Sequence, residues 1–370
     1  MQIKNSSITK IPTRLATFLL IFLLALPVLL TGCATANPSA NLESKELFWP
    51  SAPFEPKIHW LKSIHNRNDA GITKSFWKKV VEFVAGEESD GIVKPYGIFV
   101  DAQERLFVAD SGRGVVHQFN LKEKEYVLIG GGAKRVFMSP IALAGDDGGN
   151  LYITDSAAGT VFRYSIREKT MTPFLAGTVE RPTGIAFNSR KRLLYIADSG
   201  SHQVFAFDVQ GRERFRIGIR GERPGEFNFP TDIFIDSAGD LYVTDALNAR
   251  IQIFTAEGTF LNMFGSAGDT AGYFAKPKGV AVDSEGHIYV SDAMQDSVQV
   301  YDKKGVLMLD FGEKGSGPGQ FWMPSGLFID GNDTIYVSDS YNQRVQIFKY
   351  LKDKEEKPVT PPLKPTVPSK

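Results

Sequence analysis

Residues 241–254 read LYVTDALNARIQIF, two short segments of alternating side chains joined by a polar turn. Alternation with a period of two predicts β-strands, and the small polar residues between them predict an antiparallel hairpin. Asp245, Asn248 and Arg250 stand within six positions, as the polar groups of an active site would. A catalytic site is built once whereas a structural unit is copied, so the number of copies decides between the two interpretations.

The hairpin occurs six times. Its first strand ends in an aspartate in every copy, namely Asp110, Asp155, Asp198, Asp245, Asp292 and Asp339. The successive spacings are 45, 43, 47, 47 and 47 residues, and each period holds four segments with strand character. Around Asp245 these segments are 231–236, 241–245, 249–254 and 259–265. Four short antiparallel strands per period predict the blade of a β-propeller, so we predict an all-β fold of six blades.

The sixth copy ends after three strands, at RVQIFKY. Residues 57–64, KIHWLKSI, have strand character but precede the first copy. We expect them to pair beside the last strand, which joins the first and last blades and removes an exposed edge. Residues 75–86 carry apolar side chains at helical spacing and predict a short amphipathic helix.

Each copy opens on a proline, and these are Pro95, Pro140, Pro182, Pro230, Pro277 and Pro324. A glycine follows two positions later in four copies, as Gly97, Gly184, Gly279 and Gly326, while Ala142 and Asp232 take its place in the others. Together with the strand-end aspartate, this motif resembles the NHL repeat over about residues 92–349. The resemblance implies a six-bladed propeller. It also brings in NHL-type amidating lyases and related propeller hydrolases, whose metal ligands converge on the central channel.

Lys4, Lys10 and Arg14 precede an uncharged apolar run of 16 residues, which is too short for a membrane span and typical of a signal peptide. The run leads to Leu30-Thr31-Gly32-Cys33, which resembles the lipobox of bacterial lipoproteins. That resemblance implies cleavage before Cys33, the only cysteine of the chain, and attachment of palmitate-type acyl chains to it. The alternative is a signal-anchor helix followed by an incidental cysteine.

We therefore expect a chain anchored by lipid in the bacterial envelope. Ala34 after the cysteine implies the outer membrane, facing either the periplasm or the outside. The expected organisation is a signal peptide over 1–32, a proline-rich tether over 33–56, the propeller over 57–350 and a disordered proline- and lysine-rich tail over 351–370. Without the leader the chain holds 39 basic and 42 acidic residues, so its net charge of −3 does not favour a nucleic-acid partner.

Residues that recur in every copy are expected to have structural roles. We predict that the strand-end aspartates accept hydrogen bonds from the following turn, and that Arg250 and Arg344, at one repeat position, pair with neighbouring turns. The five histidines fall at unrelated repeat positions, and a catalytic zinc ion generally needs three protein ligands. We therefore predict no catalytic residue, metal or cofactor, with a metal-dependent lyase or lactonase in the channel as the alternative.

Function is expected where the copies differ. The second residue after the aspartate is small in the first three copies (Gly112, Ala157 and Gly200) and large in the last three (Leu247, Met294 and Tyr341). The turns that carry them emerge on one rim of the propeller, and Trp322 and Met323 are expected to extend the same surface. We predict a partner-binding surface here. The alternative is that these side chains fold onto neighbouring turns and cover the rim.

A second difference lies near the mouth of the channel. Lys94, Arg181, Lys276 and Lys278 flank the Pro-x-Gly motifs, and Asp232 replaces a glycine. These residues predict a site for a small anion or an acidic segment, with ordinary surface charge as the alternative. The leading hypothesis is a monomeric, non-enzymatic propeller that binds an envelope protein or peptide through one rim.

Overall fold

The computed structural model of the chain describes residues 46–73, 90–132 and 135–352, all within one compact unit that begins at Glu46. The predicted signal peptide, Cys33, the predicted helix over 75–86 and the tail beyond residue 352 lie outside the described residues. In the described part of the chain, no helix is long and apolar enough to cross a membrane.

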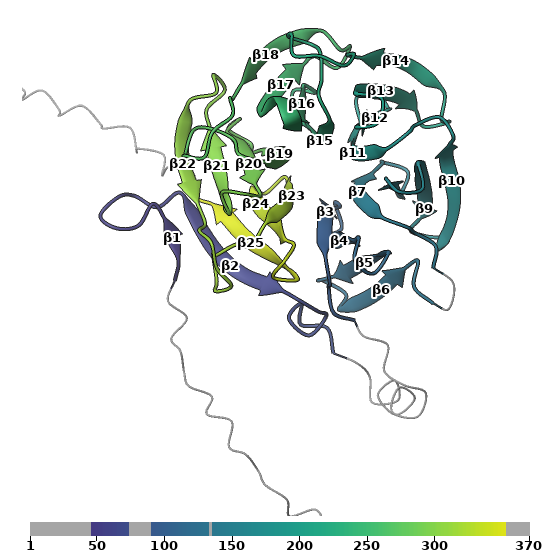
Figure 1. Cartoon of the computed structure of the whole chain (residues 1–370). Coiled ribbons are helices and arrows are strands. Elements are labelled where there is room, and N and C mark those ends of the chain that lie inside the picture. The colour runs from purple at the N-terminus through teal and green to yellow at the C-terminus, as the bar shows by residue number, and fades with distance from the viewer. Residues whose placement is uncertain (1–45, 74–89, 133–134, 353–370) are drawn as a thin grey trace, which may run out of the picture. The chain divides into compact units, whose positions relative to one another are not determined.

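Six antiparallel sheets surround a central channel, and the strands nearest to it are β3, β7, β11, β15, β19 and β23 (Figure 1). Blades one to three are β3 (Pro95–Val100), β4 (Arg105–Asp110), β5 (Val115–Asn120) and β6 (Glu125–Ile129); β7 (Pro140–Gly145), β8 (Asn150–Asp155), β9 (Thr160–Ser165) and β10 (Thr170–Ala176); and β11 (Pro182–Asn188), β12 (Leu193–Asp198), β13 (Gln203–Asp208) and β14 (Glu213–Ile217).

Blades four and five are β15 (Pro230–Ile235), β16 (Leu241–Asp245), β17 (Arg250–Phe254) and β18 (Phe260–Phe264), and β19 (Pro277–Val282), β20 (Ile288–Asp292), β21 (Ser297–Tyr301) and β22 (Leu307–Phe311). Blade six contains β23 (Pro324–Ile329), β24 (Thr334–Asp339), β25 (Arg344–Tyr350), β2 (Ile58–Ile64) and β1 (Phe48–Trp49). A single turn of 3₁₀-helix, Ala246–Asn248, follows β16. The prediction of an all-β, six-bladed propeller is confirmed.

The ring closes through strands from opposite ends of the chain. β2 pairs antiparallel with β25, with Ile58 opposite Tyr350 and Ile64 opposite Val345, in the place expected for the fourth strand of blade six. Ile64 is fully buried with Ile98 and Leu106 of blade one, so the strand also packs between the last and first blades. The closing strand is therefore held by backbone hydrogen bonds and by apolar contacts.

Two predicted boundaries differ from the structure. The tether was expected to run to residue 56, yet β1 lies within it and pairs with β2, placing Trp49 opposite Ile58. The Trp49 ring packs against Phe311 and Phe348, with centroid distances of 6.0 and 5.9 Å, and burial of this large aromatic surface explains the extra strand. At the other end, Lys352, expected in the tail, forms an ion pair of 3.0 Å with Asp333.

Close approach of neighbouring blades explains the Pro-x-Gly motif. A Cβ atom at Gly97 would collide with the carbonyl oxygen of Ile141, and one at Gly326 would collide with that of Tyr96. The glycines therefore allow the innermost strands to pack backbone against backbone around the channel. Apolar side chains fill the wider space between blades farther out, as where Tyr195 of blade three packs with Leu241 of blade four.

Replacement of Ile64 by alanine should destabilise the whole ring. The fully buried side chain would leave a cavity between blades one and six, and such truncations cost about 2–5 kcal/mol. Leu61→Ala on the same strand is the matched control, because Leu61 is exposed. We expect urea unfolding to show a lower midpoint for Ile64→Ala and little change for Leu61→Ala. Equal effects of the two changes would contradict this account of closure.

Candidate functional site

The repeated aspartates hold two segments of each blade together. Asp110 accepts hydrogen bonds from the N–H groups of Gly112 and Arg113 in the turn after β4, at 3.0 and 3.1 Å. Its carboxylate also accepts from the N–H groups of Val93 and Lys94, which precede β3, at 2.8 and 3.0 Å. The predicted turn bond is therefore present, and the sequence did not reveal the second pair of bonds. A buried carboxylate with four backbone donors is a structural clamp.

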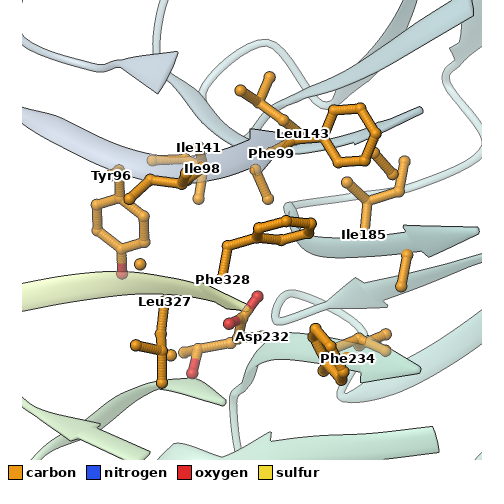
Figure 2. A pocket seen from close by; sticks show the side chains of 18 of the residues that line it. Tyr96, Ile98, Phe99, Ile141, Leu143, Ile185, Asp232, Phe234, Leu327 and Phe328 are labelled. Atoms are coloured by element: carbon orange, nitrogen blue, oxygen red, sulfur yellow. The ribbon is translucent and has the colours of Figure 1, made fainter. Parts of the chain in front are cut away.

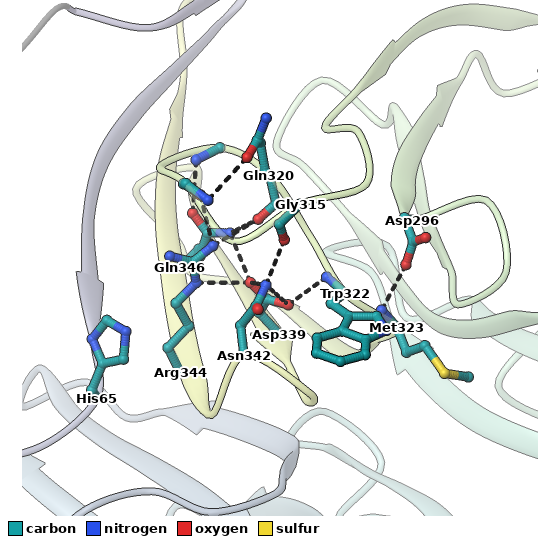
Figure 3. A network of polar contacts seen from close by, with 12 residues as sticks. His65, Asp296, Gly315, Gln320, Trp322, Met323, Asp339, Asn342, Arg344 and Gln346 are labelled. Atoms are coloured by element: carbon teal, nitrogen blue, oxygen red, sulfur yellow. Dashed lines mark hydrogen bonds and ion pairs between the residues drawn. The ribbon is translucent and has the colours of Figure 1, made fainter.

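Blades four and six extend this clamp with arginine. Arg250 donates to Asp245 at 2.8 Å, and its guanidinium also donates to the carbonyl groups of Glu222, Arg223 and Glu226 in the long loop before β15. Figure 3 shows the same arrangement around Asp339 and Arg344 in blade six. All the polar groups that made residues 241–254 resemble an active site therefore bond to one another or to backbone. They are structural.

The histidines also have local partners. His117 is fully buried and lies 3.2 Å from Asp110 and 2.8 Å from the Tyr126 hydroxyl, in the strand position that Gln252 and Gln346 take in other blades. Burial lowers the pKa of His117 below its ordinary value, so the ring is neutral at pH 7. Within the described ranges, no group of three or more His, Cys, Asp or Glu side chains is placed to hold a metal ion. The metal-dependent alternative therefore finds no ligand set among these residues.

Large apolar side chains project from one rim. Leu247 and Met294 are 64% and 66% exposed, and Trp322 and Tyr341 are each half exposed, with their rings 5.5 Å apart. Met323 is half-buried beside Trp322. The backbone beneath them is fixed, because the N–H of Leu247 donates to the Asn228 carbonyl and that of Met294 to Asp292. Leu247 and Met294 therefore stand out into solvent on rigid turns.

The same surface includes two residues that the sequence reasoning missed. Val93 and Met138 are exposed and lie two positions before the opening prolines of blades one and two, the repeat position of Trp322. The strand-end aspartate of the same blade holds the backbone N–H of each of the three. Alignment of the six copies at this position would have revealed them. We define the apolar rim patch as Val93, Met138, Leu247, Met294, Trp322 and Tyr341.

The innermost strands enclose a cavity of about 270 Å³ in the channel (Figure 2). Most of the side chains that line it are apolar, including Ile98, Phe99, Ile141, Leu143, Ile185, Phe234, Leu327 and Phe328. The Phe328 ring packs edge-on against Phe99 and Phe234, at centroid distances of 5.6 and 6.4 Å. Small-molecule sites are typically apolar hollows with a few polar groups, and this cavity lies near the lower end of their size range of ~300–1,000 Å³.

Four polar residues line the cavity, namely Tyr96, Thr231, Asp232 and Lys278, and three of them can ionise. Burial raises the pKa of Asp232 to about 7, although the N–H of Val280 donates to its carboxylate at 3.1 Å. Burial and the nearby charge of Asp232 raise the pKa of Tyr96 to about 12, and burial lowers the pKa of Lys278. The structure thus brings together groups whose ionisation depends on what enters the channel.

The residues predicted at the channel mouth divide into two sets. Asp232 and Lys278 line the cavity. Lys94, Arg181 and Lys276 are exposed and are not part of its lining. The ammonium group of Lys94 instead lies 5.7 Å from the centre of the Tyr341 ring, which connects it to the apolar rim patch.

Two known protein families match segments within the repeated part of the chain. Residues 181–241 and 237–308 match a family described as a 6-bladed beta-propeller, and residues 321–348 match the NHL repeat. The chain is a six-bladed β-propeller, and residues 321–348 form an NHL repeat. A segment of 68 residues is 28% identical to Protein brain tumor of Drosophila melanogaster. That alignment spans 18% of this chain and only 6% of the fly protein.

Solved structures of similar fold have diverse functions. Virginiamycin B lyase of Staphylococcus aureus is 14% identical, with a TM-score of 0.52 over 70% of this chain and 96% of its own. An auxiliary nutrient binding protein of Bacteroides thetaiotaomicron is 14% identical, with a TM-score of 0.57 over 71% of this chain and 70% of its own. Regucalcin of Agrobacterium tumefaciens, a calcium-binding protein, is 15% identical, with a TM-score of 0.52 over 69% and 90%. These likenesses show the propeller fold alone.

Replacement of Asp232 by asparagine should change how stability depends on pH. The folded chain keeps the Asp232 proton up to about pH 7, whereas an unfolded chain releases it near pH 4, so this group lowers the free energy of unfolding as pH rises between these values. Between pH 5 and pH 8, the free energy of unfolding of Asp232→Asn should rise by about 2 kcal/mol relative to that of the wild type, allowing for partial solvent access. Urea unfolding at both pH values measures this gain.

Asp269→Asn is the matched control, because Asp269 is an exposed carboxylate in a loop. It should follow the wild type at both pH values. If the free energies of unfolding of the wild type and of Asp232→Asn changed equally with pH, the Asp232 carboxyl group would have an ordinary pKa.

Proposed function

We propose that this protein is a lipid-anchored scaffold of the bacterial envelope that binds another protein or a peptide through the apolar rim patch. The observation that carries the proposal is the exposure of Leu247 and Met294, about two thirds each, on turns whose backbone is already fixed. Several large apolar side chains exposed on one rim are typical of a binding site. A rigid frame loses little conformational entropy when a partner docks.

The composition of the patch supports the same function. Trp, Tyr and Met are enriched at protein interfaces, and Trp and Tyr are frequent among the residues that contribute most binding energy. The Trp322 and Tyr341 rings contact each other, and Lys94 lies against the Tyr341 ring, so the three form one surface of mixed aromatic and cationic character. In blade three, the two residues before the opening proline, which correspond to Trp322 and Met323 of blade six, are the charged Glu180 and Arg181. The partner would therefore meet an apolar surface interrupted by one charged segment.

Anchoring by lipid is proposed from the leader. The short apolar run and the Leu30-Thr31-Gly32-Cys33 sequence support export and acylation at Cys33. Each buried methylene group of an acyl chain contributes about 0.8 kcal/mol to membrane binding, so two or three chains hold a protein stably on a bilayer. The proposed location is the outer membrane. The rim would then present its patch to other components of the envelope.

Serine at Leu247, Met294 and Tyr341 together should abolish partner binding. Loss of an interface anchor costs about 2 kcal/mol or more, so removal of three should weaken binding by at least about a hundredfold. We expect the wild type, but not this variant, to retain a specific protein when it is used to capture partners from envelope extracts. A photo-crosslinking residue placed at Met294 should link to the same protein.

The matched control for this experiment is Leu261→Ser with Met308→Ser, because both are exposed apolar residues on the outermost strands of blades four and five. This variant should capture the partner as the wild type does. If the rim variant captured as much partner as the control, the binding surface would have to lie elsewhere.

The lipid anchor makes a separate prediction. The N-terminal peptide of the wild type, isolated from bacterial membranes, should begin at Cys33 and carry the mass of its acyl chains. The Cys33→Ser chain should keep residues 1–32 and incorporate no labelled fatty acid. Mass spectrometry and metabolic labelling measure both properties. A wild-type chain that retains its leader would identify that segment as a signal anchor instead.

A further inference from the structure

The central channel holds a carboxyl group with no charged partner. Asp232 takes the place that glycine has in four other blades, and its side chain projects into the cavity near Leu327 and Phe328 (Figure 2). It accepts hydrogen bonds from the backbone N–H groups of Val280, at 3.1 Å, and Ile233. Among the residues that the structure describes, no lysine, arginine or histidine forms an ion pair with it. A carboxylate in an apolar cavity without a counter-ion is destabilised, and a cation from outside would stabilise it.

A second polar group faces Asp232 across the ring. Tyr96 belongs to blade one and Asp232 to blade four, and these blades lie opposite each other in a ring of six. The charge of Asp232 contributes to the raised pKa of Tyr96, so the two groups lie close enough to interact. The Tyr96 hydroxyl forms no hydrogen bond with any residue in the described ranges. A molecule in the channel could therefore meet a carboxylate from one wall and a hydroxyl oxygen from the other.

The remaining lining favours a cation with an apolar body. Phe99, Phe234 and Phe328 line the same cavity as Asp232. The faces of aromatic rings attract ammonium groups, and their surfaces bury hydrocarbon. Lys278 is the one other charged residue of the lining, and its ammonium group is itself partly buried. The ionised Asp232 carboxylate would repel an anion, and a negative charge would gain nothing from the faces of the aromatic rings, although the charges of Lys94 and Arg181 also reach Tyr96.

We propose that the central channel binds a small organic ammonium compound with an apolar body. The ammonium group would donate to the Asp232 carboxylate and the Tyr96 hydroxyl oxygen, and the apolar body would lie among the three phenylalanines. The cavity of about 270 Å³ limits the ligand to a small molecule or to the amino end of a chain. This site is independent of partner binding at the apolar rim patch, so either can fail without the other.

The test is calorimetric titration of the full chain in detergent with 2-phenylethylammonium chloride. Binding should require the ionised carboxylate, and with a pKa of about 7 the ionised fraction of Asp232 rises about tenfold from pH 6 to pH 8. We therefore expect an affinity about tenfold higher at pH 8. Asp232→Asn should bind at least tenfold more weakly at pH 8 and show no pH dependence. Asp269→Asn, a surface change of equal charge, should bind as the wild type does.

Two further probes define the ligand. 3-Phenylpropionate has the same ring with the opposite charge and should not bind. If it bound more tightly than the amine, and if Lys278→Gln abolished that binding, the channel would be an anion site and the proposal would be wrong. The amide of Phe-Gly-Gly distinguishes the source, because tighter binding of this peptide assigns the site to the amino end of a partner chain and tighter binding of the amine assigns it to a free molecule. The proposal would also be wrong if the wild type and Asp232→Asn bound the amine with equal affinity.

Discussion

The fold depends on one recurring interaction, the bond network of a buried aspartate at the end of the second strand of each blade. In blade one, Asp110 bonds the turn that follows it and also the segment that leads into the innermost strand. Because a buried carboxylate without donors is costly, its four backbone bonds strongly favour a single geometry for the turn. The bond to the segment before the innermost strand recurs in every blade, whereas in blades four and six asparagine, arginine and glutamine side chains replace the backbone donors of the turn around Asp245 and Asp339.

Closure of the ring is the second constraint. Each blade buries its apolar faces against two neighbours, so an open ring would expose two faces and a strand edge. β2 removes the edge by pairing with β25, and Ile64 fills the space toward blade one. β1 then adds Trp49 to the outer side of blade six, where Phe311 and Phe348 form its contacts. The N-terminal segment thus belongs to the propeller more fully than its proline content predicts.

The two candidate binding regions, the apolar rim patch and the central channel, would bind their ligands through different interactions. The rim presents exposed apolar side chains on turns that the aspartates have already ordered, which suits a broad contact with a macromolecule. The channel presents one carboxyl group whose pKa burial raises to about 7, among aromatic rings, which suits a small charged ligand. Lys94, first considered beside the channel, belongs with the rim because its ammonium group lies over the Tyr341 ring. Similar folds include enzymes and binding proteins, so these local features, rather than the fold, carry the functional argument.

The sequence by itself determined the number of blades, the approximate bounds of their strands and the structural role of the repeated aspartates, because each depends on a local pattern repeated six times. The fourth strand of blade six was recognisable because the sixth copy ends after three strands while residues 57–64 stand outside the copies. It also identified Leu247, Met294 and Tyr341 as the positions where the copies differ. Only the tertiary structure decided which residues share a surface or a cavity. Val93 and Met138 join the rim from blades one and two, and Asp232 faces Tyr96 across the ring from a position 136 residues away in the chain. The reason is that side-chain exposure, and the burial that raises the pKa of Asp232, arise from contacts between blades, which no single repeat contains.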